Sequence, residues 1–439
     1  MYMMEITEEI AQKALDIVLN YVEEAEVFLE KEEKVDVDIQ NDQVDFAKKV
    51  SSYGVGIRVI HEGKMGFAYT TDLNKLQQTA ENAVFNAKCN VVDENFVLAS
   101  KSQYPQVSGI YDQKIRYLDV EDTVEFAKTM INAAVEEGCQ PTSGGVSSGC
   151  FNTVITNSDG VFAEDLSTAF SGFISVNIAD GEGVSTAHES DSSRYLDIDP
   201  EEISRKACQI ARDSRGGKSV DTRDMDVVFD YNAAAALVYT FANAFNADNV
   251  QRGRSVYADK VGEQVLVPSL NIYDDGTLKK GLMTAKSDGE GTPSQRTTLV
   301  EKGILKNFIY DLYTSKKAGV HSTGNGMRSS FADMPSVGFS NFMLDFEDLN
   351  DVSQIKDGML VTNLLGAHTA NPISGDFSVE AMNAFKIEDG ELTYPVKKAM
   401  ISGNVFEAFS KASATSKKTR QIGSFVVPPI LVSKLRVVG

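Results

Sequence analysis

Glycine-based turn signals divide the second half of the chain into short segments in which apolar and polar residues alternate. The clearest segments are residues 264–276, 297–314, 358–366, 375–396 and 428–439. Alternation with a period of two is typical of β-strands that bury one face. Glu301–Gly303 and Glu388–Gly390 have the composition of hairpin turns between such strands. Residues 223–439 are therefore predicted to form a strand-rich C-terminal domain.

The first half of the chain combines helices with strands in two units. In residues 1–110, a helical pattern over 5–22 precedes strands around 35–39, 53–60 and 65–70, and a second helix follows Thr71 or Asp72. This helix–meander–helix order favours an α+β unit over a parallel nucleotide-binding fold.

A mixed middle unit is expected over residues 111–222. Asp119 starts a helix that Gly138 ends, strands run from about residue 146 to 180, and Asp199 with Pro200 starts another helix. The predicted fold class is a multi-domain α+β protein with domains at 1–110, 111–222 and 223–439.

Length and charge narrow the range of functions. The 439 residues exceed what one hydrophobic core usually organises. Lys and Arg number 42 against 63 Asp and Glu, and the net charge of −21 disfavours nucleic acid as a partner. No apolar run is long enough to span a membrane, and the acidic N-terminus does not resemble a signal peptide. A cytoplasmic location is expected, and the four cysteines are expected to be buried thiols.

No self-sufficient catalytic motif is evident. The four histidines, His61, His188, His321 and His368, lie far apart in the sequence, and no H-E-x-x-H or phosphate-binding loop is present. Two acidic segments, Asp274–Gly276 and Asp288–Pro293, contain oxygen ligands that suit a divalent cation. The flanking strands favour hairpin turns or loops for the same segments, and a loop that contacts a substrate is the second interpretation.

Longer strings resemble the TldD/TldE (PmbA) family, whose members are also described as modulators of DNA gyrase. The resemblance is strongest in the last third of the chain, in QRGRS (251–255), VGEQV (261–265), DDGT (274–277), DGEGTP (288–293), LVEKGILKNFIYD (299–311), STGNG (322–326), SGDFS (374–378), residues 387–404 and residues 427–439. In the first half it includes YGVGIRV (53–59), NSDGVFAED (157–165) and IADGEG (178–183). The family implies a three-domain α+β protein that acts in intracellular peptide cleavage.

The resemblance also shows which positions would hold a metal. TldD-type members carry H-E-x-x-x-H before the segment that here reads NADNVQRGRS, with a cysteine near the C-terminus as a third zinc ligand. Counting back from QRGRS places the two histidines at Val238 and Asn243 and the glutamate at Tyr239, and no cysteine follows Cys208. The chain therefore resembles the TldE (PmbA) branch, which implies no catalytic residue and no metal in this chain, and zinc in a TldD-like partner.

The leading hypothesis is a non-catalytic subunit of a heteromeric TldD/TldE zinc metallopeptidase that processes extended peptides. A homodimer in the absence of the partner is also considered. The alternatives are a protein-binding modulator of a gyrase-type topoisomerase and an independent hydrolase whose acidic loops recruit a metal.

Three glycine-rich loops are the candidates for the substrate cleft. They contain Asp288, Glu290, Gly291, Thr323, Gly324, Asn325, Gly375 and Asp376. Their glycines would allow a peptide backbone to approach closely, although tight turns without a ligand remain the alternative interpretation.

Overall fold

A long antiparallel sheet underlies the N-terminal half of the molecule. The computed structural model describes residues 2–439, with side chains from Thr7 onward. The sheet has the strand order β3-β2-β1-β4-β5-β6. Its strands are β1 (Glu24–Gln40), β2 (Gln43–His61), β3 (Lys64–Thr70), β4 (Gln140–Asn157), β5 (Phe162–Asp180) and β6 (Gly183–Ser193). β1 pairs with β4 from Glu26 opposite Asn157 to Gln40 opposite Ser143, so both N-terminal units contribute to one sheet.

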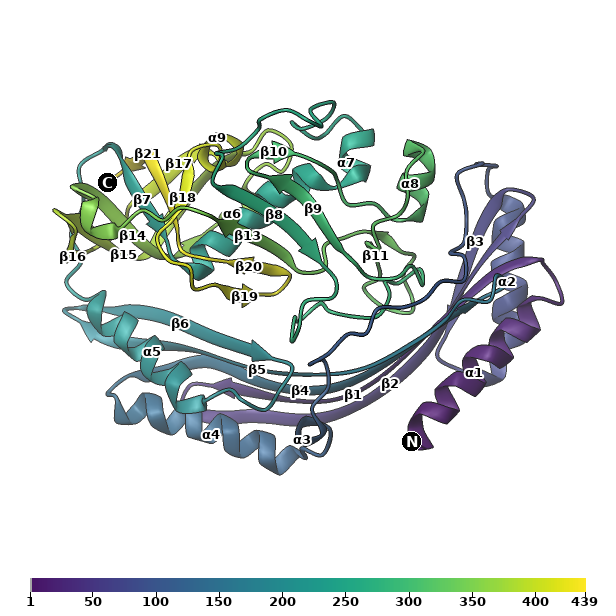
Figure 1. Ribbon diagram of the computed structural model, residues 1–439. Helices are drawn as coiled ribbons and strands as arrows, with labels where there is room; N and C mark the ends of the chain where they lie inside the picture. Colours follow the sequence, from purple (N-terminus) through teal and green to yellow (C-terminus); the bar gives the residue numbers. More distant parts are fainter. Residues whose placement is uncertain (1) are drawn as a thin grey trace.

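The helices lie against one face of this curved sheet, and the C-terminal half lies over the other (Figure 1). These helices are α1 (Tyr2–Val18), α2 (Leu76–Cys89), α3 (Gln113–Arg116), α4 (Val120–Glu136) and α5 (Pro200–Asp213), with the 3-10 turn η1 (Leu73–Lys75) before α2. Two separate apolar cores form beneath the sheet, one with α1 and α2 and one with α4 and α5. The alternation at Val35, Val37 and Ile39 reflects burial in the second of these cores.

Local sequence signals account for most element boundaries in this half. Asp119 caps α4 in a capping box with Asp122, and Asp199 caps α5 with Pro200 in its first turn, as predicted. Gly138 has a φ of +76° just after α4 ends. Two boundaries were predicted wrongly. α1 ends at Val18 rather than at residue 22, and the strands expected from about residue 146 begin earlier, since β4 starts at Gln140.

The C-terminal half is strand-rich, as the sequence predicts. One sheet has the order β10-β9-β8-β13-β20-β19 and the other β14-β7-β21-β17-β15-β16, and an added pairing of β14 with β15 closes five strands of the second sheet into a small barrel. The strands are β7 (Arg223–Phe229), β8 (Leu270–Asp275), β9 (Arg296–Glu301), β10 (Ile304–Leu305), β11 (Gly326–Met327), β12 (Ser336–Val337), β13 (Phe342–Phe346), β14 (Asp357–Leu365), β15 (Asp376–Glu388), β16 (Glu391–Val396), β17 (Met400–Asn404), β18 (Ala412–Ala414), β19 (Arg420–Ile422), β20 (Phe425–Val427) and β21 (Ile430–Val438).

Few helices occur in this half. They are α6 (Tyr231–Ala242), α7 (Ala247–Gln251), α8 (Leu312–Ala318) and α9 (Val405–Phe409), with the 3-10 turns η2 (Asn243–Phe245), η3 (Val352–Gln354) and η4 (Ala367–Thr369). The two predicted hairpin turns are confirmed, because Lys302 with Gly303 and Asp389 with Gly390 all have positive φ. Tyr310–Thr314 was predicted within a strand segment, but Asp311 instead caps α8.

The thiols follow the prediction only in part. Cys139, Cys150 and Cys208 are buried and free, whereas Cys89 is exposed at the end of α2. Within residues 2–439, no helix is both long and apolar enough to cross a membrane.

Candidate functional site

The helix α6 holds the positions at which the sequence places a zinc motif. Val238 is 0% exposed within the main C-terminal core. Tyr239 is 62% exposed, with its ring packed edge-on against Phe425 at a centroid distance of 6.2 Å. Asn243 follows the last residue of α6, and its amide nitrogen donates to the Tyr239 carbonyl at 2.8 Å. An apolar side chain, a phenol and an amide do not fit a zinc ion, which prefers imidazole, thiolate and carboxylate ligands.

Across the described part of the chain, no three His, Cys, Asp or Glu side chains are placed to share a metal ion. The residues at the predicted motif positions also do not converge, because Val238 is buried in the core while Tyr239 is exposed. The side chains of α6 therefore give no physical basis for metal chemistry.

The segment after α6 is shaped by amide side chains. Asn246 caps α7 by accepting from the backbone of Asp248, and its amide nitrogen donates to the Val337 carbonyl at 3.0 Å. Arg252 pairs with Asp248 one helical turn earlier, with Nε–Oδ distances of 2.8 and 2.9 Å. This pair gives Arg252 a local role at the end of α7.

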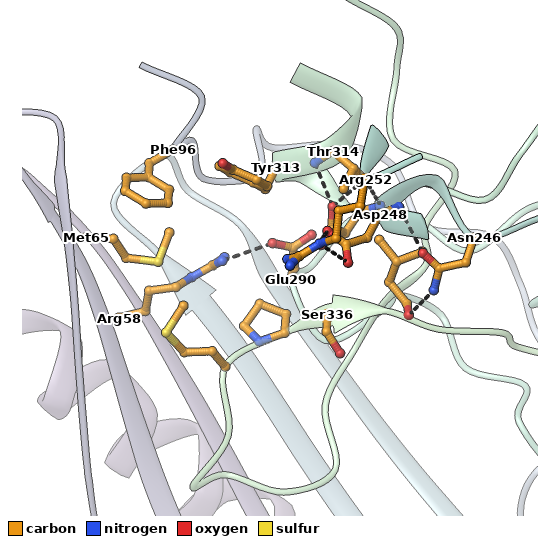
Figure 2. A pocket seen from close by; sticks show the side chains of 14 residues that line it. Arg58, Met65, Phe96, Asn246, Asp248, Arg252, Glu290, Tyr313, Thr314 and Ser336 are labelled. Carbon is orange, nitrogen blue, oxygen red and sulfur yellow. Dashed lines mark hydrogen bonds and ion pairs between the residues drawn. The ribbon is translucent and has the colours of Figure 1, made fainter. Parts of the chain in front are cut away.

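A pocket of about 460 Å³ lies between α7 and the end of the N-terminal sheet (Figure 2). Arg58, Met65 and Phe96 approach it from the N-terminal half, and Asp248 of α7 and Arg252 just after it face them. The remaining lining residues are Asn246, Glu290, Asp311, Tyr313, Thr314, Met334, Pro335, Ser336 and Val337. Because both halves of the molecule contribute, the pocket depends on how they dock.

Buried ion pairs join the two halves beside this pocket, and Arg58 and Glu290 among them also line it. Arg58 on β2 donates to Glu26 on β1 at 2.5 Å and to Glu290 of the C-terminal half at 2.9 Å. Arg328 also pairs with Glu26, and its Nε donates to the Gly289 carbonyl at 2.6 Å. All four side chains are nearly inaccessible to solvent, so each charge depends on its partners.

Burial changes the acidity of the carboxyl groups in this region. Desolvation raises the pKa of Glu290 despite the opposing charge of Arg58. Desolvation and the nearby Glu290 raise the pKa of Asp288 well above its usual value. Desolvation also raises the pKa of Asp274 to about 6, although Ser340 and Asn325 donate hydrogen bonds that oppose the shift.

Six of the eight predicted cleft residues lie in or beside this buried region. The carboxylate of Asp288 accepts from the backbone of Glu290 and Thr292 at 2.9 Å and of Gly326 at 2.8 Å. Gly291 has a φ of +79°, and its carbonyl accepts from Tyr104 at 3.1 Å. Each oxygen of Asp288 and Glu290 already accepts a hydrogen bond, which argues against the hypothesis of a recruited metal.

The loop with Thr323, Gly324 and Asn325 packs against the same region. Thr323 donates to Asn325 at 2.7 Å, and Asn325 donates to Asp274 at 2.7 Å. A Cβ atom on Gly324 would lie 2.7 Å from the Pro293 carbonyl oxygen, so the two loops are in close contact. Only Glu290 of these six residues lines the pocket beside α7.

Gly375 and Asp376 lie elsewhere. A Cβ atom on Gly375 would lie 2.5 Å from the ring of Phe406, and Asp376 accepts from Asn404 at 3.0 Å and from Ser374 at 2.8 Å. These partners are all near the start of α9, and none belongs to the buried ion pairs. The structure therefore does not bring the third predicted loop together with the other two.

Several residues of the site were not found from the sequence. Glu26, Arg58 and Arg328 form the ion pairs, and Phe96, Asp311 and Tyr313 line the pocket. One sequence signal was available, because Arg58 interrupts an otherwise apolar strand in YGVGIRVI. A charged residue in a buried strand requires a partner, but its partners are remote in sequence.

Comparison with known proteins agrees with the resemblance seen in the sequence. Residues 222–439 match the family model of the PmbA/TldA metallopeptidase C-terminal domain, residues 25–87 match domain 1, and residues 113–215 match the central domain. An uncharacterised protein of Methanocaldococcus jannaschii is 37% identical over 409 residues, 93% of this chain and 95% of that relative.

More distant relatives carry names. The metalloprotease TldD homologue of Haemophilus influenzae is 27% identical over 395 residues, 83% of this chain and 80% of that relative. The crystal structure of TldE from Thermococcus kodakarensis is similar with a TM-score of 0.91 and 25% identity, covering 98% of this chain and 100% of that chain. With three family domains matched in order and a relative similar over nearly its whole length, this chain belongs to the PmbA/TldD family of metallopeptidase-like proteins.

Proposed function

We propose that this chain is a non-catalytic subunit of a heteromeric zinc metallopeptidase, in which a TldD-like chain supplies the zinc. The chemistry of α6 carries the proposal: Val238, Tyr239 and Asn243 stand where the family motif has its ligands and base, and none can replace them. The similarity to TldE over 98% of this chain supports the same assignment.

The proposed contribution of this chain is to bind an extended peptide and to complete the chamber in which the partner cleaves it. Tyr239 supports this role, because its side chain is 62% exposed on a helix that is otherwise largely buried. An exposed aromatic ring at this position offers a contact surface for a peptide or a partner subunit. The expected setting is peptide processing in the cytoplasm.

Reconstitution tests the proposal. The purified chain, a TldD-like partner and their mixture are assayed on an unstructured peptide, and zinc is measured in each sample. Cleavage is expected to be much faster in the mixture than with either chain alone, with zinc present only in samples that contain the partner. Full activity of the partner alone would contradict the proposed role.

A pair of variants tests whether α6 contributes to the activity of the complex. Tyr239→Ala is expected to lower the activity of the mixture, whereas Phe85→Ala, which removes an equally exposed ring from α2, is the matched control and leaves it unchanged. Equal effects of both variants would show that α6 has no special part in the complex.

A further inference from the structure

The pocket beside α7 contains a carboxylate oxygen without a hydrogen-bond donor. Asp311 is the N-cap of α8, and its Oδ1 accepts from the backbone of Thr314 at 2.8 Å and from the Thr314 hydroxyl at 2.6 Å. No residue in the described part of the chain donates to its Oδ2, although Asp311 lines the pocket and is only 6% exposed. Oδ2 is not among the fully buried atoms without a partner, so it is accessible from the pocket and can accept from solvent or from a ligand.

The charges around Asp311 favour a cation as that ligand. Both arginines of the pocket already have carboxylate partners: Arg58 pairs with Glu26 and Glu290, and Arg252 pairs with Asp248. Asp311 has no basic partner among the ion pairs of the described chain. The pocket therefore carries an excess of negative charge next to its least satisfied oxygen.

The walls of the pocket select among cations. Phe96 and Tyr313 pack with their ring centroids 5.5 Å apart, and Tyr313 is held by a 2.8 Å hydrogen bond that its hydroxyl donates to Asp93. Met65, Met334 and Pro335 add apolar surface. Aromatic and apolar walls suit an organic ammonium on an alkyl stem better than a hydrated metal ion.

We propose that this pocket binds a primary ammonium group of an extended peptide, from either its α-amino terminus or a lysine side chain. The ammonium donates to Oδ2 of Asp311, and the alkyl portion lies against Phe96 and the methionines. A volume of about 460 Å³ accommodates the group together with part of the following residue. The choice of a peptide rests on the proposed function, but the ammonium site itself involves this chain alone.

Binding to the isolated chain tests the proposal. Three unstructured hexapeptides with a C-terminal fluorophore serve as probes: one with a free amino terminus and no lysine, its N-acetylated form, and the N-acetylated form with one lysine. Fluorescence anisotropy gives the dissociation constants. At least one amine-bearing peptide is expected to bind about tenfold or more tightly than the acetylated lysine-free peptide, because only the amine-bearing probes can form a charge-assisted hydrogen bond to Asp311.

The comparison between the two amine-bearing peptides identifies the source of the ammonium group. Tight binding of only the first probe assigns the α-amino terminus, and tight binding of the third assigns the lysine side chain. Equal binding of all three probes, or no binding of any of them, would overturn the proposal.

Asp311→Asn tests the named oxygen while it keeps the helix cap, because asparagine is as good an N-cap as aspartate. Affinity for the amine-bearing probe is expected to fall about tenfold, with the acetylated lysine-free probe unaffected. Asp119→Asn is the matched control, since Asp119 caps α4 with the same capping box outside the pocket. An unchanged affinity in Asp311→Asn, with both variants folded by circular dichroism, would refute the site.

Phe96→Leu tests the aromatic wall, and affinity for the amine is expected to fall a few-fold. Binding by the isolated chain and reconstituted cleavage are separate readouts. If binding holds while the mixture of subunits shows no added activity, the proposed function fails and the ammonium site stands. If cleavage is reconstituted but the acetylated lysine-free peptide binds as tightly as the others, only the ammonium site fails.

Discussion

Two loops with similar sequences have opposite environments in this molecule. DGEGTP (288–293) and SGDFS (374–378) each combine glycine with an acidic residue and small polar residues. The first loop is packed between the N-terminal sheet and the C-terminal half, where Asp288 and Glu290 are buried and fully hydrogen-bonded. In the second loop, Asp376 is exposed and bonds only to neighbours near the start of α9.

The difference comes from what packs on each loop. Arg58 on β2 and Arg328 after β11 surround the first loop with positive charge, and Arg58 is 232 residues from Glu290 in the sequence. Among the residues from Thr7 onward, no arginine or lysine forms an ion pair with Asp376, whose carboxylate instead accepts from Asn404 and Ser374. An acidic glycine-rich loop can thus be a joint between domains or a surface feature, and only its distant partners distinguish the two.

Removal of Arg58 is the strongest test of this contrast. Arg58→Met leaves Glu26 and Glu290 buried with less compensation, and it is expected to lower the free energy of unfolding by about 3–5 kcal/mol. Urea denaturation measures the loss. Arg223→Met is the control, because the Arg223–Asp357 pair is exposed on both sides and such pairs contribute about 1 kcal/mol or less. Similar losses in both variants would mean that the buried ion pairs are not special.

The buried carboxyl of Asp274 gives a pH test of the same region. Its pKa is raised to about 6 in the folded chain, so the folded state holds a proton that the unfolded state releases near pH 4. Stability is therefore expected to fall as pH rises from about 4 to about 6, by as much as about 3 kcal/mol at one site.

The measurement is the free energy of unfolding as a function of pH for the wild type and for Asp274→Asn. The difference in the free energy of unfolding between the two proteins reports the titration of Asp274. As the pH rises from about 4 to about 6, the wild type is expected to lose stability relative to Asp274→Asn. A difference that stays constant from pH 4 to 7 would show that the carboxylate is well accommodated by Ser340 and Asn325.

Gly326 tests how closely the chain at β11 packs against Glu290 of the first loop. A Cβ atom at this position would lie 2.4 Å from Oε2 of Glu290, whose side chain is held by Arg58 and the backbone of Leu312. Gly326→Ala is expected to cost about 1–3 kcal/mol of stability, because the carboxylate cannot move without losing these bonds.

Gly183→Ala in β6 is the control, because the nearest atom to its Cβ would be 3.8 Å away. A neutral or slightly stabilising change is expected there. If Gly326→Ala proved equally neutral, Glu290 would be more mobile than its bonds suggest, and the loop would be less firmly joined to the sheet.

Features that depend on neighbouring residues were predicted from the sequence, whereas features that depend on residues far apart in the sequence were not. Helix caps such as Asp119 and Asp199 and the hairpin turns at Gly303 and Gly390 depend on a few neighbouring residues, so they were predicted correctly. The family followed from strings that match it in the same order along the chain. The motif positions at Val238, Tyr239 and Asn243 were counted back from QRGRS and stay a prediction. The docking of the N-terminal sheet on the C-terminal half depends on pairs such as Arg58 with Glu290, and no local pattern reveals such pairs.

The last and smallest expected effect concerns Asp376. Hydrogen bonds from Asn404 and Ser374 lower the pKa of this carboxyl, and the side chain is exposed, so Asp376→Asn is expected to leave the thermal unfolding midpoint unchanged. Asp351→Asn, an exposed aspartate that caps η3, serves as the control. If the second loop contacts the peptide, as the sequence predicts, Asp376→Asn slows cleavage by the reconstituted complex while Asp351→Asn does not. Equal cleavage rates in the two variants would instead favour a turn without a ligand, because an exposed carboxylate that affects neither stability nor substrate has only a local role in its loop.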